Sequence, residues 1–189
     1  NWRLTTARTM DTKLVDVTTG APIDAPGQSG ELCFRGANVF SGYFRMPEAT
    51  ERTFDAEGFY RTGDLFEIAG DNGQYFRFVG RAKDIIVRGG MNISAEEIES
   101  LLSEHPSLLE AAVVGYPDER LGEKVCAVVV PRADATVSID DVAGYLRDIK
   151  KVAVYKLPQR LMGLDRLPRS PAGKVLKARL RELARAEPV

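Results

Sequence analysis

The sequence predicts an α+β protein, with a strand-rich first part followed by a part that mixes strands and helices. Up to about residue 81, short apolar segments alternate with turns rich in Gly, Asp, Asn and Pro, which is typical of antiparallel β-structure. From Ala95 onward, apolar residues recur with the helical period. With 189 residues and 44% hydrophobic side chains, the chain can form one large domain or two small ones.

The first part is expected to contain short antiparallel strands and a short helix. Its apolar segments are "KLVDV", "ELCFRG", "GYF", "GFYRTGDLFEI" and "QYFRFVG", and "AGDNGQ" has the composition of a hairpin turn. The segment from Pro47 to Phe54 predicts one or two helical turns. The change of period places a domain boundary within Gly80 to Gly90.

The second part is expected to be a small α+β domain with three strands. These are "EAAVVGY", "KVCAVVVP" and "QRLMGLDRL", and the continuous apolar run of the second predicts burial on both faces. Capping boxes at Ser94 with Glu97 and at Ser138 with Asp141 open two helices, and a third is expected over Val175 to Ala184. The residues expected on the inner helical faces are Ile98, Leu101 and Leu102 in the first helix and Val142, Tyr145, Leu146 and Ile149 in the second.

Charge and hydropathy exclude several classes of partner. The 27 acidic and 26 basic residues give a net charge of −1, so no overall field attracts nucleic acid or anionic lipid. No apolar run approaches the ~20 residues that span a bilayer, and the start, "NWRLTTARTM", lacks the order of a signal peptide. We therefore expect a cytoplasmic protein without a membrane span and without nucleic acid as a partner.

The cysteines and the histidine predict no metal site. Cys33 and Cys126 each lie inside an apolar run, which favours buried thiols over a disulfide or a nucleophile. His105 follows a helical pattern and precedes a proline, a position that favours a capping role over metal ligation.

A complete nucleotide cradle is missing from the sequence. It contains neither a Walker loop nor a dinucleotide fingerprint, and "RGG" at residues 88–90 is too short for either. The chain also begins at Asn1 without Met, on the approach to a predicted strand. We expect it to be part of a longer protein.

Four stretches, read together, resemble the adenylate-forming superfamily of acyl-CoA synthetases, aryl-CoA ligases, luciferases and peptide-synthetase adenylation domains. They occur in the family's order and cover nearly the whole chain: "GELCFRGANVFSGYFRMPEAT", "YRTGDL", "GRAKDIIVRGGMNISAEEIE" and "PRSPAGK". The resemblance implies a β-barrel-like subdomain that closes the large adenylation domain over residues 1–83. It also implies a small mobile C-terminal domain over residues 84–189.

Two polar residues match the family's nucleotide-binding positions. Asp64, in "TGD", corresponds to the aspartate that binds the ribose of ATP, and a carboxylate can accept hydrogen bonds from both ribose hydroxyls. Arg81 corresponds to the arginine close to the ribose and phosphate. The alternatives are a turn-capping Asp64 and a surface salt bridge of Arg81.

The "GRAKDIIVRGG" segment matches the family's hinge and thiol tunnel. The resemblance implies that Lys83 and Asp84 form the hinge, where backbone torsions change as the small domain rotates between two poses. Gly89 and Gly90 match the loop that lines the pantetheine tunnel in the second pose, and their alternative is a plain hairpin turn.

Lys174 matches the family's catalytic lysine. A fixed ammonium would stabilise the negative charge that develops when a carboxylate attacks the α-phosphate of ATP. Pro168, Pro171 and Gly173 shape the loop, and Ala172 stands where the family usually has a hydroxyl residue. The alternative places Lys174 on a solvated basic helix face, together with Lys177, Arg179 and Arg181.

The resemblance implies an AMP-forming ligase that first adenylates a small-molecule carboxylic acid with ATP and Mg²⁺ and then forms a thioester. Coenzyme A is the expected acceptor and the pantetheine of a carrier protein the alternative. Because the phosphate-binding loop and the acyl pocket precede Asn1 in the family, we expect these 189 residues to need an N-terminal domain of the same chain for activity. A docking or regulatory module without catalysis is the alternative from a different class.

Overall fold

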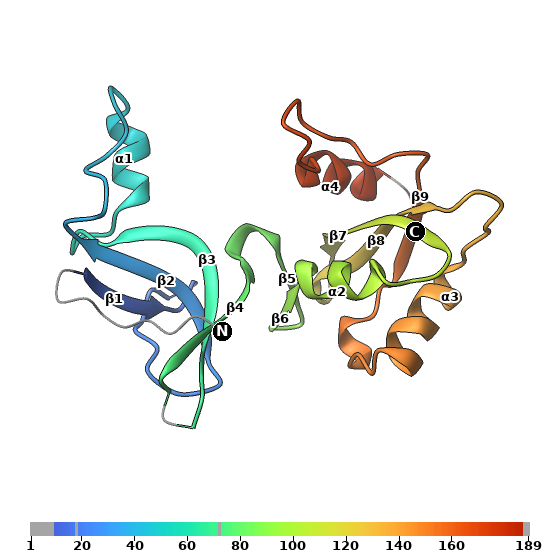
Figure 1. Ribbon diagram of the computed structural model, residues 1–189, viewed down its shortest axis with the longest axis horizontal. Helices are drawn as coiled ribbons and strands as arrows, with labels where there is room; N and C mark the ends of the chain where they lie inside the picture. Colours follow the sequence, from blue (N-terminus) through green and yellow to red (C-terminus); the bar gives the residue numbers. More distant parts are fainter. Residues whose placement is uncertain (1–9, 18, 72, 187–189) are drawn as a thin grey trace. The chain divides into compact units, whose positions relative to one another are not determined.

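The computed structural model describes residues 10–17, 19–71 and 73–186. The expectation that the start is not a signal peptide concerns residues 1–10, of which the first nine lie outside the described residues. By its internal contacts the chain divides into two compact units, residues 1–83 and 84–189. Each unit is described by itself (Figure 1).

The first unit contains a four-stranded antiparallel sheet in the order β1-β2-β3-β4. The strands are Met10–Val15, Ser29–Gly36, Tyr60–Ala69 and Tyr75–Arg81. Alternating side chains of the first three strands bury Leu14, Leu32 and Ile68 in one cluster, because neighbours along a strand point to opposite faces. The sheet is antiparallel as predicted, but it is open, with β1 and β4 as its edges within the described residues.

The predicted helix and hairpin of the first unit are confirmed. Helix α1 covers Pro47–Thr53 and begins with proline, whose missing N–H is no loss in a first turn. Residues 70–74 join β3 to β4, and Gly70 and Gly73 there have positive φ angles of 91° and 65°.

The second unit is built on a five-stranded sheet, not the expected three-stranded one. Its order is β6-β5-β8-β7, with β9 parallel to β8. The strands are Ile85–Arg88, Met91–Ser94, Leu108–Asp118, Gly122–Pro131 and Arg160–Gly163, for β5 to β9 in turn. The two additional strands, β5 and β6, form a hairpin. The sequence placed β5 in the boundary, and β6 is the four residues that follow this boundary.

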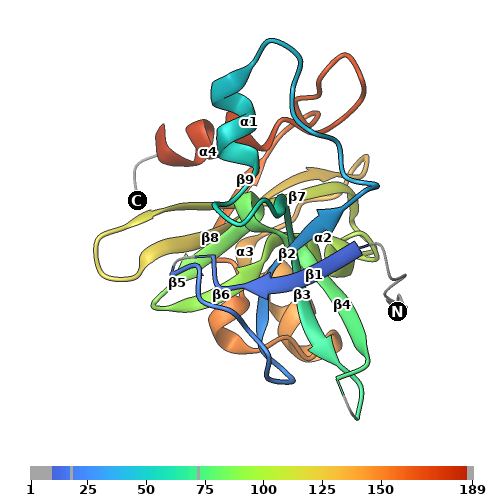
Figure 2. The same ribbon diagram turned by 90° about the vertical axis from the view of Figure 1, so that its left-hand side faces the viewer.

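Helices cover both faces of this sheet (Figures 1 and 2). On one face lie α2, Ala95–Leu102, and α3, Ile139–Gly144, packed on Val125, Ala127 and Val129 of β8. On the other face lies α4, Lys177–Ala186, packed on Cys126, Val128 and Val130. The predicted burial of β8 on both faces is therefore confirmed.

Both predicted N-cap serines are confirmed, although the Glu97 carboxylate of the first box pairs with Lys156, and the second helix ends differently from the expectation. The Ser94 hydroxyl accepts a hydrogen bond from the Glu97 amide, and Ser138 with Asp141 forms a complete capping box. After Gly144 the helix widens into a π-helical turn, Tyr145–Ile149. Because a π-helical turn contains more residues than an α-helical turn, its last residue is rotated away from the face that an α-helix would give it. Ile149 is consequently 67% exposed, and its prediction as a core residue was wrong.

The cysteines and the histidine are structural. Both Cys33 and Cys126 are free and buried, as predicted, and burial raises the pKa of the Cys33 thiol to about 11. His105 is 6% exposed, its Nδ1 accepts the amide of Ser107, and its ring packs edge-on against Tyr145. Over the described residues, no group of three or more His, Cys, Asp or Glu side chains could hold a metal ion.

Candidate functional site

The "TGD" segment forms a bulge in β3. Glu31 of β2 pairs with Leu65, whereas Cys33 pairs with Arg61, so the β3 side of the ladder carries extra residues. A bulge of this kind re-aims the side chains of the residues that it contains. Gly63 has a φ of 71°, the left-handed region that glycine adopts without steric cost.

Glu31 and Thr62 hold this bulge in place. The Gly63 amide donates to Glu31 Oε1 over 2.9 Å, and Arg61 donates twice to Glu31 Oε2, over 3.1 and 2.9 Å. The Thr62 hydroxyl donates to the Leu32 carbonyl and accepts the Asp64 amide. Because Glu31 is only 5% exposed, its carboxylate forms a fixed base beneath the bulge.

Asp64 and Arg81 lie side by side on neighbouring strands. They are register partners of β3 and β4, and Arg81 Nε lies 3.1 Å from Asp64 Oδ1. The two atoms are close enough for a hydrogen bond but are not aligned for one. Asp64 Oδ1 is a buried atom that accepts no hydrogen bond within the described residues. The Asp64 side chain is 30% exposed and that of Arg81 51%. The accessible part of the Asp64 carboxylate and the half-exposed guanidinium of Arg81 thus lie side by side at the surface of the first unit.

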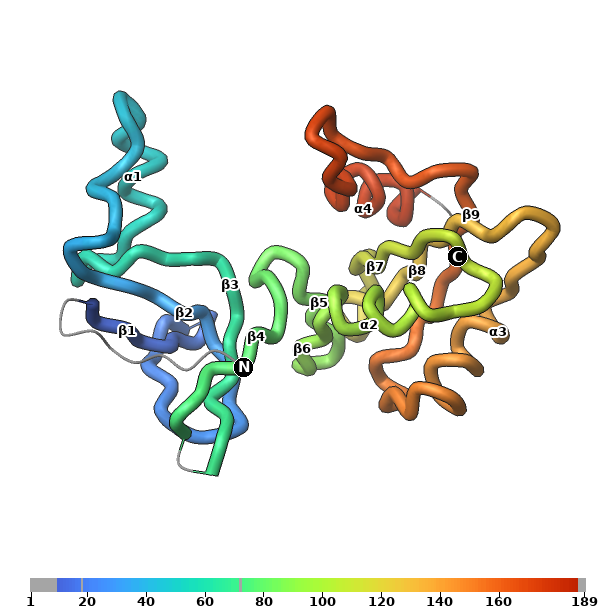
Figure 3. Tube along the Cα trace, in the orientation of Figure 1, coloured from blue at the N-terminus to red at the C-terminus, as the bar shows by residue number. Residues whose placement is uncertain are grey.

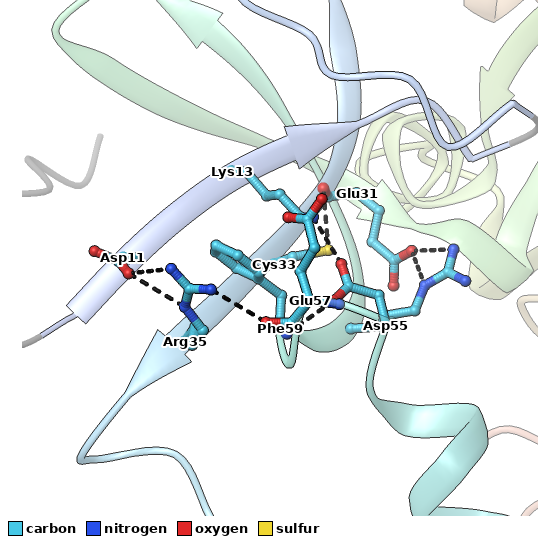
Figure 4. Close-up of polar contacts among 9 residues, drawn as sticks. Asp11, Lys13, Glu31, Cys33, Arg35, Asp55, Glu57 and Phe59 are labelled. Atoms are coloured by element: carbon cyan, nitrogen blue, oxygen red, sulfur yellow. Dashed lines mark hydrogen bonds and ion pairs between the residues drawn. The ribbon is translucent and has the colours of Figure 1, made fainter.

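A polar cluster fixes the segment that leads into the bulge (Figure 4). Lys13 pairs with Asp55 over 2.7 Å and with Glu57 over 2.9 Å, and its ammonium lies 4.3 Å from the centroid of the Phe59 ring. Arg35 covers the same ring at 4.5 Å and donates to the Glu57 carbonyl. These contacts connect residues 55–59 to β1 and β2, immediately before β3 begins.

Lys83 and Asp84 lie in a short 3₁₀ turn, Ala82–Asp84, on either side of the division between the two units. Lys83 is exposed, whereas Asp84 is 8% exposed. The Asp84 carboxylate accepts a hydrogen bond from Arg181 of α4 over 2.8 Å. Nothing in the sequence pattern indicates that this side chain is buried and paired.

Gly89 and Gly90 form the turn between β5 and β6. Both have positive φ angles, 57° and 80°, as in the two-residue turns that suit the twist of a hairpin. The Gly89 amide donates to the Leu121 carbonyl over 2.7 Å, which holds the turn against the β7–β8 connection. Nothing lies within 4 Å of a methyl group added to Gly90, so one side of the turn is open.

Glu123 and Arg88 support the same hairpin, and neither was singled out from the sequence. Glu123 Oε2 accepts the Val87 amide over 2.9 Å, and its carboxylate passes over Gly115, where an added methyl group would lie 2.7 Å from Oε1. Arg88 donates to the Tyr155 carbonyl over 3.0 Å. The hairpin is thus attached to β8 and to the 3₁₀ turn Val154–Lys156.

Lys174 lies at the end of a compact loop between β9 and α4, drawn in red in Figure 3. Arg169 bridges to Val175, the Ser170 amide donates to the Lys174 carbonyl, and the Gly173 amide donates to the Ser170 carbonyl. Arg169 also donates to the Gly173 carbonyl over 2.7 Å and pairs with Glu110 of β7. The loop is therefore fixed to the sheet.

The Lys174 ammonium has no hydrogen bond or ion pair with any residue that the structure describes, and the residue is exposed. It lies before the first helical residue, Lys177, so it does not belong to the helix face proposed as the alternative. A rigid loop that ends in an unpaired ammonium is a suitable donor for an anionic group.

The Lys174 loop and the Gly89–Gly90 turn lie at opposite ends of the sheet of the second unit. The loop is attached at Glu110, near the start of β7, whereas the turn adjoins Gly122, which pairs with Asp118 at the end of β7. The strand between Glu110 and Asp118 spans about 27 Å at ~3.4 Å per residue. The two loops cannot act at one point while the unit stays still.

Comparison with known proteins identifies relatives of this chain. The family of AMP-binding enzyme C-terminal domains matches residues 97–174. The medium-chain fatty-acid–CoA ligase of Escherichia coli K12 is 46% identical over 158 residues, which are 83% of this chain and 27% of that protein. The salicyl-AMP ligase / salicyl-S-ArCP synthetase of Mycobacterium tuberculosis is 42% identical over 158 residues, 84% of this chain and 27% of that protein. The chain thus spans about a quarter of the length of these relatives.

Solved structures give the same relationship. ATP-bound MatB from Rhodopseudomonas palustris matches with a TM-score of 0.78 at 38% identity, over 94% of this chain and 34% of that chain. The apo structure of the same protein matches over the same shares with a TM-score of 0.61. In the described residues, no helix has the length and apolar character needed to cross a membrane. The chain belongs to the adenylate-forming superfamily and contains its AMP-binding enzyme C-terminal domain.

Proposed function

We propose that this chain is the C-terminal portion of an AMP-forming acid–thiol ligase. Such an enzyme joins a carboxylate to ATP, giving an acyl adenylate and pyrophosphate, and a thiol then displaces AMP to give a thioester. The observation that carries the proposal is Lys174, whose ammonium is unpaired and whose loop is fixed to the sheet. The glycine turn, which has an open side, is attached to the same sheet about 27 Å further along β7.

Lys174 would act in the first half-reaction. Attack of the carboxylate oxygen on the α-phosphorus forms a P–O bond and breaks the bond to pyrophosphate, so negative charge grows on the phosphoryl and leaving-group oxygens. The ammonium would lie against these oxygens. Removing one preorganised donor of this kind typically lowers kcat about 10²–10³-fold.

Asp64 and Arg81 would bind the nucleotide. The Asp64 carboxylate, 30% exposed, would accept a ribose hydroxyl, and the half-exposed guanidinium of Arg81 beside it can donate to a second ribose or phosphate oxygen. The fixed bulge above Glu31 supports this role, because it holds the carboxylate before the ligand arrives. Mg²⁺ would enter with the phosphates of ATP, and these residues offer no cluster for it.

The two half-reactions would use two poses of the second unit. One pose presents the Lys174 loop, and the other presents the Gly89–Gly90 turn, whose open side suits a narrow pantetheine chain. Lys83 and Asp84, where the two units divide, would form the joint.

Coenzyme A is the acceptor that we propose, and the pantetheine of a carrier protein is the second candidate. The relative from E. coli is named as a CoA ligase and the one from M. tuberculosis as an ArCP synthetase, at similar identities. The stretches "RGGMNISAEEIE" and "GKVLKARL" resemble free-standing CoA ligases, which favours the first. The remainder of the enzyme, with the acyl pocket for a small carboxylic acid, would be an N-terminal domain of the same polypeptide.

The test is the exchange of pyrophosphate into ATP by the complete polypeptide that carries this chain. Lys174→Ala is expected to lower exchange about 10²–10³-fold, while thioester formation from supplied acyl adenylate is largely retained. The control is Arg185→Ala, which removes an exposed cation of α4. Equal exchange by Lys174→Ala and wild type would reject catalysis by this lysine and support a docking or regulatory module. The 189 residues alone are expected to show no exchange.

A further inference from the structure

A chain of partly buried charges connects the first residue of the second unit to helix α4. The Asp84 carboxylate accepts from Arg181 over 2.8 Å, and Lys177 lies 4.0 Å away on its other oxygen. Lys177 also pairs with Glu99 of α2 over 2.9 Å. The side chains of these four residues, which we call the α4 anchor, are between 10% and 25% exposed.

The α4 anchor also reaches the edge of the sheet. Glu99 Oε1 accepts the Val113 amide of β7 over 2.7 Å. Because β7 is an edge strand, this amide points away from β8, and the carboxylate satisfies it. The side chains of the α4 anchor therefore connect four elements: the 3₁₀ turn Ala82–Asp84, α2, β7 and α4.

The α4 anchor has a mechanical consequence for the joint. A rotation about the N–Cα bond of Asp84, its φ angle, keeps Cβ and the carbonyl carbon together and leaves the contact with Arg181 intact. A rotation about the Cα–C bond, its ψ angle, turns Cβ relative to the following strand and would pull the carboxylate from Arg181. The buried pair therefore opposes motion on one side of Asp84 only, since separating it leaves a charge without a partner.

We propose that the α4 anchor sets the position of Lys174 relative to the joint, and that Arg181 is a positioning residue for the adenylation step. This rests on the proposed function. Two residues separate Lys174 from α4, and the Leu176 amide at the entry to the helix donates to the Pro168 carbonyl of the loop. A helix held at Asp84 therefore carries the Lys174 loop with it as the second unit swivels.

The experiment compares Arg181→Gln with Arg179→Gln in the complete polypeptide. Both changes remove a guanidinium from α4, but Arg179 pairs with Glu182 on the surface, where both side chains are more than 60% exposed. Arg181→Gln is expected to lower kcat for pyrophosphate exchange about 10–100-fold, with KM for ATP changed less than threefold. Thioester formation from supplied adenylate is expected to change less. Arg181→Lys, which keeps a cation, should recover part of the loss.

A second readout does not depend on activity. Hydrogen exchange at the amides of Gly173, Leu176 and Leu180 reports on the loop and the first turn of α4, since each donates a backbone hydrogen bond there. We expect exchange to become at least tenfold faster in Arg181→Gln and less than twofold faster in Arg179→Gln. If Arg181→Gln is poorly folded, Asp84→Asn with Arg181→Gln removes both charges and serves in its place.

The outcomes separate the two proposals. The positioning role would be overturned if Arg181→Gln and Arg179→Gln showed equal hydrogen-exchange rates in the loop and α4 and equal rates of adenylation. This holds whatever the activity of the wild type. A wild-type protein without adenylation would overturn the proposed function and the catalytic part of this inference. Faster hydrogen exchange together with a selective loss of adenylation supports both.

Discussion

The contacts of Glu123 with Gly115 and Val87 predict that Gly115→Ala destabilises the second unit in the wild type and stabilises it in Glu123→Ala. In Gly115→Ala, the new methyl group would lie 2.7 Å from Glu123 Oε1, closer than carbon and oxygen approach. The end of the glutamate side chain is the part that can move, so the hydrogen bond to the Val87 amide should break. In Glu123→Ala this obstacle is absent.

The expected magnitudes follow from the two contacts. A hydrogen bond between a charged group and an amide contributes about 1.5–3 kcal/mol, and we use the lower end because Val87 is 48% exposed. Alanine in a strand interior is favoured over glycine by about 0.5–1 kcal/mol. Gly115→Ala should therefore lower the unfolding free energy of the second unit by about 0.5–1 kcal/mol in the wild type and raise it by a similar amount in Glu123→Ala.

The assay is native-state hydrogen exchange at the slowest amides of β8, which report on unfolding of the second unit alone. Glu123→Gln is the control, because it keeps an oxygen acceptor for Val87. If Gly115→Ala has the same effect with and without Glu123, within about 0.3 kcal/mol, the two side chains do not compete for space and the reasoning is refuted.

Three further outcomes test the burial of single residues. Iodoacetamide at pH 8 should leave Cys33 and Cys126 unlabelled in the folded chain and label both after denaturation, because both are buried and the pKa of Cys33 is raised to about 11; labelling at the rate of a free thiol would disprove this. Burial raises the pKa of Glu99 above 4.5, so its contribution to the unfolding free energy is greatest below pH 4.5 and falls as pH rises through the folded-state pKa. In urea titrations over this range, the wild type should lose stability relative to Glu99→Gln as pH rises. A difference in unfolding free energy that stays constant with pH would contradict this. Leu146→Ala should cost about 2–5 kcal/mol and Ile149→Ala less than about 0.5 kcal/mol in the same titrations, and equal costs would show that Ile149 is packed.

The sequence predicted features that depend on neighbouring residues. The two helix caps, the glycine turn at Gly89 and Gly90 and the two-sided burial of β8 each follow from a few consecutive side chains. Short segments have conformational preferences of their own, and in natural proteins these preferences agree with the folded structure. The number of strands was underestimated because β5 and β6 contain only four residues each, too few to show a period.

Contacts between distant residues were not predictable from the pattern. The partner of Asp84 is 97 residues away, that of Gly63 is 32 residues away, and Glu123 reaches Val87 across 36 residues. In each case a charged residue of unremarkable sequence context satisfies a group in another element. Such pairs depend on the packing of the whole unit, so one sequence alone does not identify them.

The dimensions of the second sheet limit how the proposed enzyme could move. If the Lys174 loop and the Gly89–Gly90 turn exchange places at one site, each must travel about 27 Å, the length of β7 between their attachments. A swivel of ~20° about the midpoint would move either loop only about 5 Å at this radius. Internal bending cannot supply the remainder, because β8 is buried on both faces and close-packed interiors resist deformation. About this midpoint, a displacement of about 27 Å corresponds to about a half-turn. If the proposed joint supplies the exchange, we expect the rotation to occur at Lys83 and about the N–Cα bond of Asp84, because the contact of Asp84 with Arg181 opposes rotation beyond that bond.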